Sequence, residues 1–224
     1  MNKKKRRQVV DMGNQEMVEY LVRIGAIKSE NVRMAFLAVD RGMFTTRNYN
    51  GSAYMDYPIP ITDGQTISAP SVVAIMLEYL EIKKGQKILE IGSGSGYNTA
   101  LLSYLVGESG KVVSIEYLSS LYEIANANLK KCAWCKNVLL INGDGSEGYE
   151  KEAPYDRIIV TAAMPYIENH PLTKQLKKDG ILVAPVGNKY YQDLVIYKNG
   201  KSKSVLPVAF VPLRGKYGFK DDAI

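Results

Sequence analysis

The sequence predicts an α/β protein with a doubly wound, mostly parallel sheet, a helical extension before the sheet and antiparallel strands at its end. Between residues 87 and 186, short apolar runs alternate with stretches of helical spacing, which is typical of a parallel sheet covered on both faces. Before this region the spacing is helical and then irregular. After Gln192 two runs joined by a tight turn indicate a hairpin.

The part before the sheet predicts two helices and a long loop. Asn14 can cap a helix over 15–24, and Ser29 can cap a second helix that carries apolar residues from Val32 to Val39. The stretch 40–64 is rich in Gly, Asn, Tyr and Pro, so we expect irregular chain there. We therefore divide the 224 residues into an N-terminal helical and loop segment, 1–68, and a sheet-bearing domain, 69–224.

The remaining elements follow in alternation. Pro70 suits the first turn of a helix, and Lys83-Lys84-Gly85 suits its end. The predicted strands are 87–91, 111–116, 138–142, 156–162 and 180–186, and the predicted helices between them are 98–106, 119–131 and 172–178. The final hairpin is predicted to pair 194–197 with 205–212 across the turn 198–201.

Charge and hydropathy limit the classes of partner. The net charge is +6, of which the run Lys3–Arg7 supplies five, so the rest of the chain is nearly neutral. A short basic tail is either a solvated segment or a contact for RNA or another polyanion. No apolar run approaches the roughly 20 residues that span a bilayer, and no signal-peptide core follows the basic run. We expect a cytoplasmic protein without a membrane partner.

The cysteines and the histidine do not predict a metal centre. Cys132 and Cys135 are spaced C-x-x-C, but a structural zinc site needs four ligands and the chain has one histidine, His170. The two cysteines are either an incidental or structural pair, or a disulfide or redox pair. We expect His170 at the surface, since it lies in a linker between Pro165 and Pro171.

A glycine-rich loop follows the first predicted strand of the parallel sheet. It reads Glu90-Ile91-Gly92-Ser93-Gly94-Ser95-Gly96-Tyr97, and ligands bind parallel sheets at this edge. Dinucleotide sites favour G-x-G-x-x-G, whereas here the third glycine comes one residue early. A carboxylate at position 90 would repel a pyrophosphate but favour a cation. The loop therefore predicts S-adenosylmethionine, which carries a sulfonium and an ammonium group.

Two further acids end the next two strands. Glu116 lies about 20 residues past the loop, where a carboxylate can accept hydrogen bonds from both ribose hydroxyls. Asp144 can accept one from the adenine amino group. The predicted cofactor-binding residues are Glu90, Gly92, Ser93, Gly94, Gly96, Tyr97, Glu116, Asp144 and Gly145.

The segment after the fourth strand argues against methylation of amino groups. Enzymes that methylate bases or amides typically carry an Asn/Asp-Pro-Pro-aromatic motif there. This chain has Thr161-Ala162-Ala163-Met164-Pro165-Tyr166, which lacks the acid or amide.

Motifs upstream of the sheet point to another acceptor. Tyr54–Pro60 and Asp63-Gly64-Gln65-Thr66-Ile67-Ser68-Ala69-Pro70 resemble the protein-L-isoaspartate (D-aspartate) O-methyltransferases. The resemblance covers roughly residues 30 to 215 and includes Arg41-Gly42-Met43-Phe44 and Leu182–Gly187. Family members commonly have His after Ser-Ala-Pro, and this chain has Ser71. No essential histidine is therefore expected there.

The resemblance implies a class I, Rossmann-like methyltransferase and its chemistry. The methyl group of S-adenosylmethionine would pass to the free α-carboxylate of L-isoaspartyl residues, and to the free side-chain carboxylate of D-aspartyl residues in some members, leaving S-adenosyl-L-homocysteine. Damaged proteins and peptides would be the partners, and nucleic acid is disfavoured. Ser68 matches the family's active-site serine and Thr66 could assist it. Their alternative role is to cap the helix that starts at Pro70. The segment 1–68 would cover the site.

Two other classes of function compete with this interpretation. One is an RNA or small-molecule methyltransferase on the same fold, with the basic tail holding RNA. The other is a non-enzymatic protein that keeps the cofactor fold as a scaffold. The joint presence of Glu90, Glu116, Asp144 and Ser68 argues against a scaffold.

Overall fold

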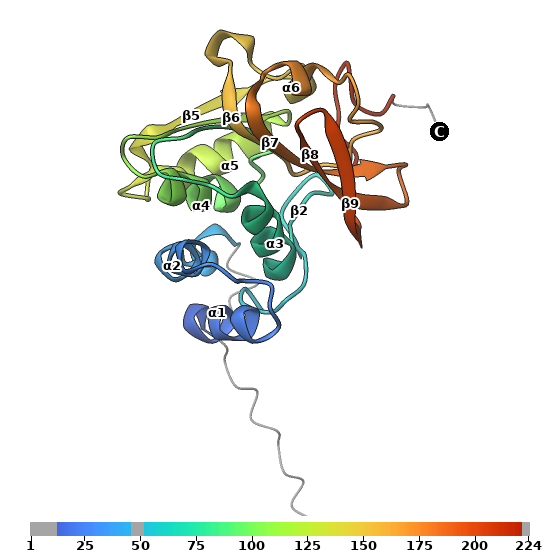
Figure 1. The fold of residues 1–224 in the computed structure, drawn as a ribbon. Coiled ribbons are helices and arrows are strands. Elements are labelled where there is room, and N and C mark those ends of the chain that lie inside the picture. The colour runs from blue at the N-terminus through green and yellow to red at the C-terminus, as the bar shows by residue number, and fades with distance from the viewer. Residues whose placement is uncertain (1–12, 46–51, 221–224) are drawn as a thin grey trace, which may run out of the picture.

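The fold is a seven-stranded, mostly parallel sheet with helices packed on it (Figure 1). The computed structural model describes residues 13–45 and 52–220, so the basic run Lys3–Arg7 lies outside the described residues. The strand order is β5-β4-β3-β6-β7-β8-β9, in which the pairs from β5 to β7 are parallel and β8 and β9 are antiparallel. The predicted fold class, a doubly wound sheet with a helical extension and an antiparallel end, is confirmed.

The bounds of the elements agree with most of the predicted ranges. The strands of the large sheet are β3 (Lys87–Ile91), β4 (Lys111–Glu116), β5 (Val138–Asn142), β6 (Tyr155–Val160), β7 (Leu176–Gly187), β8 (Gln192–Lys198) and β9 (Lys201–Val208). The α-helices are α1 (Asn14–Arg23), α2 (Glu30–Ala38), α3 (Pro70–Leu80), α4 (Tyr97–Val106), α5 (Ser119–Leu129) and α6 (Pro171–Lys174).

Two predicted ranges near the end of the sheet are wrong. The helix expected over 172–178 ends at Lys174, because Leu176 already pairs with Tyr155 of β6 and starts β7. The last strand covers Lys201–Val208 and not 205–212, because its residues pair with β8 across the tight turn at Lys198 and Lys201. Backbone pairing between strands therefore overrides the local apolar spacing in both places.

Three predictions outside the large sheet are also corrected. The region 40–64 was expected to be irregular, but Ile59–Pro60 forms β1, which pairs with β2 (Thr66–Ile67). Gly13, and not Asn14, caps α1, and the Asn14 Nδ2 atom donates to the carbonyl of Phe36 2.8 Å away. His170 is fully buried between the rings of Tyr166 and Tyr217, so it is not a surface residue.

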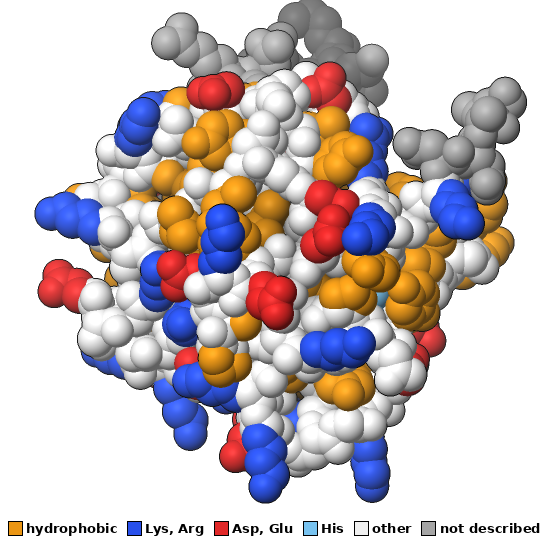
Figure 2. Space-filling model, turned by 90° about the horizontal axis from the view of Figure 1, so that it is seen from above, with side chains coloured by type: hydrophobic (Ala, Val, Ile, Leu, Met, Phe, Trp, Pro, Cys, Tyr) orange, Lys and Arg blue, Asp and Glu red, His pale blue; other side chains and the backbone are white. Residues whose placement is uncertain are grey.

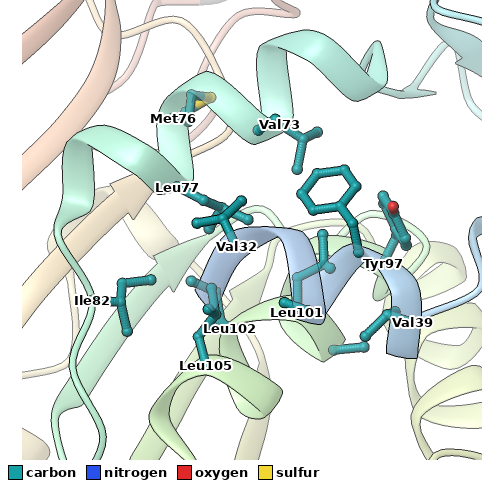
Figure 3. Packing of buried hydrophobic residues seen from close by; sticks show 14 of the residues in the cluster. Val32, Val39, Val73, Met76, Leu77, Ile82, Tyr97, Leu101, Leu102 and Leu105 are labelled. Carbon is teal, nitrogen blue, oxygen red and sulfur yellow. The ribbon is translucent and has the colours of Figure 1, made fainter. Parts of the chain in front are cut away.

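The helices pack in layers on the sheet. Helices α3 and α4 cover one face, and α1 and α2 pack on them as an outer layer, below them in Figure 1. Figure 3 shows apolar side chains of α2, α3 and α4 meeting in this core, among them Val32, Val73 and Leu101. The opposite face is covered by α6 and by the chain around Met164 and Leu213.

Hydrogen bonds that one carboxylate accepts join the outer layer of helices to the sheet-bearing part. The Oε1 atom of Glu78, on α3, accepts from the backbone nitrogens of Lys28 and Ser29 at 2.8 Å and from the Ser29 hydroxyl at 3.0 Å. The same hydroxyl caps α2, as the sequence predicts, by accepting from the Val32 nitrogen. The first helices are therefore held in one place relative to α3.

Cys132 and Cys135 form a disulfide just after α5, with Cα atoms 5.4 Å apart. Of the two alternatives left open by the C-x-x-C spacing, the structure has the bonded pair. The helices of residues 13–45 and 52–220 include none with the length and hydropathy needed to cross a bilayer.

A buried carboxylate joins β3, β4 and α4. Glu90 has no exposed surface, and its oxygens accept hydrogen bonds from Asn98 at 2.8 Å and from the hydroxyls of Thr99 and Ser114 at 2.5 Å. Burial raises the pKa of Glu90 to about 7, against the lowering effect of the three donors and with a small raising effect of Glu116.

We predict that Glu90 makes the protein less stable as the pH rises. An acid whose pKa is raised from 4.5 to about 7 on folding keeps its full contribution below pH 4.5 and loses it as the pH passes through 7. Between pH 5 and 8 this lowers the free energy of unfolding by about 2–3 kcal/mol. Denaturant unfolding at both pH values should show this loss in the native chain and much less of it in Glu90→Gln.

The control is Glu123→Gln, which changes an exposed acid on α5. This variant should keep the pH dependence of the native chain. An unchanged pH dependence in Glu90→Gln would show that Glu90 is already charged at pH 5.

Candidate active site

A well-formed cavity lies at the carboxyl edge of the parallel strands, next to the point where the strand order reverses. From β3 the chain continues to β4 on one side, whereas β6 lies on the other. Ligands of doubly wound sheets bind at such a point. The cavity encloses about 950 Å³ of space that is open to solvent, which is enough for a ligand of nucleoside size.

The glycine loop between β3 and α4 forms the floor of this cavity. Gly92, Gly94 and Gly96 have φ angles of 92°, 55° and 87°, in the left-handed region that side chains rarely adopt. A Cβ atom at Gly92 would lie 2.5 Å from the Thr161 hydroxyl, which donates to the Gly92 carbonyl. The loop keeps its shape only with glycine at these positions.

Glu116 lines the cavity and holds the loop. Its Oε2 atom accepts from the Gly94 nitrogen at 2.9 Å, and its Oε1 atom accepts from the Leu118 nitrogen at 3.0 Å. The residue is 5% exposed, so its charge is largely removed from water. Each carboxylate oxygen can accept a second hydrogen bond. Glu116 can therefore take donors from a ligand while it keeps the loop in place.

Glu90 acts on the cavity only through another side chain. It does not line the cavity, and Asn98, which does, donates its Nδ2 atom to the Glu90 carboxylate. This bond fixes the orientation of the amide and leaves the Asn98 Oδ1 atom buried without a partner. Sequence reasoning missed Asn98, although it directly follows the predicted loop at the start of α4.

Asp144 is turned away from the cavity. Its Oδ1 atom accepts from the nitrogen and hydroxyl of Ser146, and its Oδ2 atom accepts from the Lys216 nitrogen at 2.8 Å. The next residue, Gly145, does line the cavity. Asp144 thus holds the C-terminal segment near the cavity in the structure as it stands.

Tyr97 is a buried wall of the cavity, and its hydroxyl has no hydrogen-bond partner. Burial raises the pKa of Tyr97 well above its usual range. The Arg41 guanidinium, also fully buried, lies 5.3 Å from the ring centroid, and its Nε atom donates to the Ala53 carbonyl. Burial lowers the pKa of Arg41, and the nearby Tyr97 and Asp56 raise it. The short helix η1 (Arg41–Phe44) therefore packs directly on Tyr97, at the end of the glycine loop.

The β1–β2 hairpin folds back over the carboxyl edge. Thr66 and Ser68 line the large cavity, and Asp63 in the turn accepts a hydrogen bond from Ser120 at the start of α5. The Asp56 carboxylate accepts from the Ser71 nitrogen at 2.9 Å, which ties the preceding loop to α3. Ala69 is the N-cap of α3 and receives no side-chain bond, so Ser68 does not cap this helix.

A second, smaller cavity of about 410 Å³ adjoins the first. Thr66, Ser68, Thr161 and Val211 line both cavities. The Ser68 hydroxyl makes no hydrogen bond within the described part of the chain. This wall can therefore touch two ligands, one on each side.

The structure brings together most of the predicted site residues. Those on the wall of the large cavity are Thr66, Ser68, Gly92, Ser93, Gly94, Tyr97, Glu116 and Gly145, and those that do not line it are Glu90, Gly96 and Asp144. Sequence reasoning also missed Val211–Arg214, of which Val211 and Pro212 were assigned to the predicted strand 205–212 and the other two residues to no element. No group of His, Cys, Asp or Glu side chains in residues 13–45 and 52–220 could hold a metal ion.

Known proteins share this sequence and this fold. The sequence model of the family described as protein-L-isoaspartate(D-aspartate) O-methyltransferase matches residues 12–218. A protein-L-isoaspartate O-methyltransferase of Hyperthermus butylicus is 46% identical over 217 residues, which cover 92% of this chain and 90% of that protein. A second relative of that name, protein-L-isoaspartate O-methyltransferase 2 of Archaeoglobus fulgidus, is 50% identical over 196 residues, covering 86% and 89%.

Solved structures agree with the sequence comparisons. A protein-L-isoaspartate O-methyltransferase superposes with a TM-score of 0.83 at 32% identity, covering 92% of this chain and 67% of that chain. A putative enzyme of the same type from Plasmodium falciparum, in complex with S-adenosyl-L-homocysteine, gives a TM-score of 0.80 at 26% identity, covering 90% and 98%. The chain thus belongs to the protein-L-isoaspartate(D-aspartate) O-methyltransferase family, and it is an S-adenosylmethionine-dependent carboxyl methyltransferase.

Proposed function

We propose that the large cavity holds S-adenosylmethionine and that the smaller cavity admits an L-isoaspartyl residue of a damaged protein. The observation that carries this proposal is the shared wall of Thr66 and Ser68, which touches both cavities. The family assignment supports this acceptor over the RNA or small molecule that the sequence left open. Acceptance of D-aspartyl residues, which the family description names, is part of the proposal.

The residues of the large cavity fit the cofactor. Glu116 would accept hydrogen bonds from the ribose hydroxyls, and the glycine loop allows a ligand close to the backbone. The buried Asn98 oxygen needs a donor, which the ammonium group of the cofactor can supply. Glu90, behind Asn98, adds negative charge that favours a cationic ligand once it ionises, with a pKa that burial raises to about 7. Asp144 would bind adenine only if its carboxylate turned away from Lys216.

The reaction makes few demands on acid–base groups. Bound S-adenosylmethionine supplies an electrophilic methyl group on its sulfonium. A carboxylate with a pKa near 4 is already ionised at pH 7, so the acceptor needs no general base. The one histidine, His170, is buried beside Tyr166 and Tyr217 and does not line either cavity. The protein would contribute to catalysis by aligning the carboxylate with the methyl group and by excluding water.

Ser68 is placed to do the aligning. Its free hydroxyl would donate to one oxygen of the isoaspartyl carboxylate, which turns the other oxygen toward the methyl group. Thr66 would support the same carboxylate from β2. The methyl ester then loses methanol as a succinimide forms, and hydrolysis of that ring returns part of the residues to normal aspartate.

The remaining parts of the proposal concern organisation and location. Residues 1–68 would form the segment that covers the active site, and residues 69–224 the cofactor-binding domain. The position of Thr66 and Ser68 on the cavity wall supports this division. A cytoplasmic location and damaged proteins or peptides as partners, with nucleic acid disfavoured, complete the proposal.

Replacing Glu116 with Ala should weaken cofactor binding. The variant loses a buried acceptor of charge-assisted hydrogen bonds, each worth about 1.5–3 kcal/mol, so the dissociation constant should rise by at least about tenfold. Titration calorimetry with S-adenosyl-L-homocysteine measures this change. The exposed acid Glu123 on α5 provides the control variant Glu123→Ala, and equal affinity in Glu116→Ala and the native chain would remove Glu116 from the site.

Replacing Ser68 with Ala should lower turnover and leave cofactor affinity nearly unchanged. Loss of a donor that orients the reacting group costs on the order of 10²-fold in kcat. Methylation of an isoaspartyl peptide at saturating cofactor measures this loss, with Ser204→Ala on β9 as an exposed-serine control. A native value of kcat in Ser68→Ala would contradict the role given to this hydroxyl.

A further inference from the structure

Two tyrosines stand out on the surface of the protein. Tyr190 and Tyr191 are 82% and 80% exposed, whereas the other exposed large hydrophobic side chains in the described residues reach at most 49%. They occupy the turn between β7 and β8, which we call the tyrosine tip (188–191). Rings that are this exposed pack against little of the fold. Their apolar faces and hydroxyl groups are therefore available to a binding partner.

The backbone of the tyrosine tip is held firmly. The Asn188 Oδ1 atom accepts from the nitrogens of both Tyr190 and Tyr191 at 2.8 Å, and the Asn188 nitrogen donates to the Tyr191 carbonyl at 3.0 Å. Gln192 closes the turn by donating to the Asn188 carbonyl at 2.6 Å. The rings therefore project from a preorganised turn, and binding through them loses little backbone entropy.

The tyrosine tip lies on the same edge of the sheet as the active site. Strand β7 runs parallel to β6 and β3, so Gly187 at its end and the loop after β3 face the same side. Three backbone segments, 211–213, 163–164 and 185–187, lie side by side between the cavity wall and the tyrosine tip. Ala163 exchanges hydrogen bonds with Val211 and Leu213 of the cavity wall, and Met164 exchanges them with Pro185 and Gly187 at the root of the tip.

This arrangement sets the distance from the cavity to the tip. Backbone segments joined by hydrogen bonds lie about 4.8 Å apart. Two such spacings place Gly187, the root of the tip, about 10 Å from the cavity wall. An extended chain covers about 3.3–3.6 Å per residue. A polypeptide leaving the site therefore reaches the root of the tip after about three residues, and the tyrosine tip lies beyond that point.

The chemistry of this surface suits an extended polypeptide of variable sequence. Tyrosine offers a large ring for apolar contact and a hydroxyl for hydrogen bonds, at a small cost in side-chain entropy. Tyr166, 42% exposed, follows Met164 by two residues, and its ring contacts His170, so this part of the chain carries a third exposed tyrosine. On the face seen in Figure 2, hydrophobic side chains lie in several patches among charged ones.

We propose that the tyrosine tip binds the segment of a damaged protein that flanks the isoaspartyl residue, about three or more residues away from it. This inference rests on the proposed function, since it assigns a second contact to the same substrate. The tip makes long, unfolded segments better substrates than short peptides. It acts on binding of the acceptor and not on the methyl-transfer step.

The test compares two acceptors in the native chain and in the double variant Tyr190→Ser/Tyr191→Ser. One acceptor is an isoaspartyl tripeptide with one residue on each side, and the other has six residues on each side. In the variant the KM for the long peptide should rise about tenfold, because truncation of tyrosine anchors typically has an effect of this size. The KM for the tripeptide, kcat for both peptides and the affinity for S-adenosyl-L-homocysteine should stay within twofold.

Two matched variants complete the experiment. Tyr190→Phe/Tyr191→Phe keeps the rings and should keep most of the affinity for the long peptide. Ile24→Ser removes a hydrophobic side chain, 48% exposed, at the end of α1. This variant should change the KM for neither peptide. The proposal is overturned if the ratio of the two KM values is the same in the serine variant and in the native chain. Failure of the native chain to methylate either peptide would instead contradict the proposed function.

Discussion

The buried carboxylate of Glu90 is the interaction on which the site depends. It lies at the end of β3 and accepts hydrogen bonds from Ser114 of β4 and from Asn98 and Thr99 of α4. Burying a charge is costly, and the three donors offset that cost only while these elements keep their positions. The start of α4, and with it the glycine loop, is therefore fixed before any ligand binds.

The other walls of the site depend on this fixed loop. Glu116 accepts from Gly94 of the loop, and Arg41 packs on the ring of Tyr97 at its end. The β1–β2 hairpin reaches the cavity from upstream of the sheet, and Val211–Arg214 reach it from downstream. Segments that are far apart in the chain thus meet at one edge of the sheet, where parallel strands end together.

The parts of the fold that sequence could predict are those governed by local periodicity. The alternation of apolar runs with helical spacing predicted every parallel strand, since both faces of the sheet are buried. The turn predicted the final hairpin, but not the bounds of its second strand. Local periodicity failed where pairing decides the structure, as at Leu176, which belongs to β7, and at Ile59, which belongs to β1. The burial of His170 depends on Tyr166 and Tyr217, which no local pattern relates to it.

The site divides in a similar way. Gly92, Gly94, Glu116 and Ser68 belong to motifs that place them on the cavity wall. Asn98 and Arg214 carry no motif and reach the wall only through folding. Asp144 shows that a position at the end of a strand does not determine where the side chain points. Its position follows from the end of β5, but its oxygens are directed by Ser146 and Lys216.

The central claim is that this edge of the sheet carries out methyl transfer to the carboxylate of an isoaspartyl residue. The most direct measurement is transfer of a labelled methyl group from S-adenosylmethionine to two peptides of identical sequence, one with an L-isoaspartyl and one with a normal L-aspartyl residue. We expect base-labile label on the isoaspartyl peptide and only background label on its aspartyl twin. Equal labelling of the two peptides, or stable label on nitrogen, would contradict the claim.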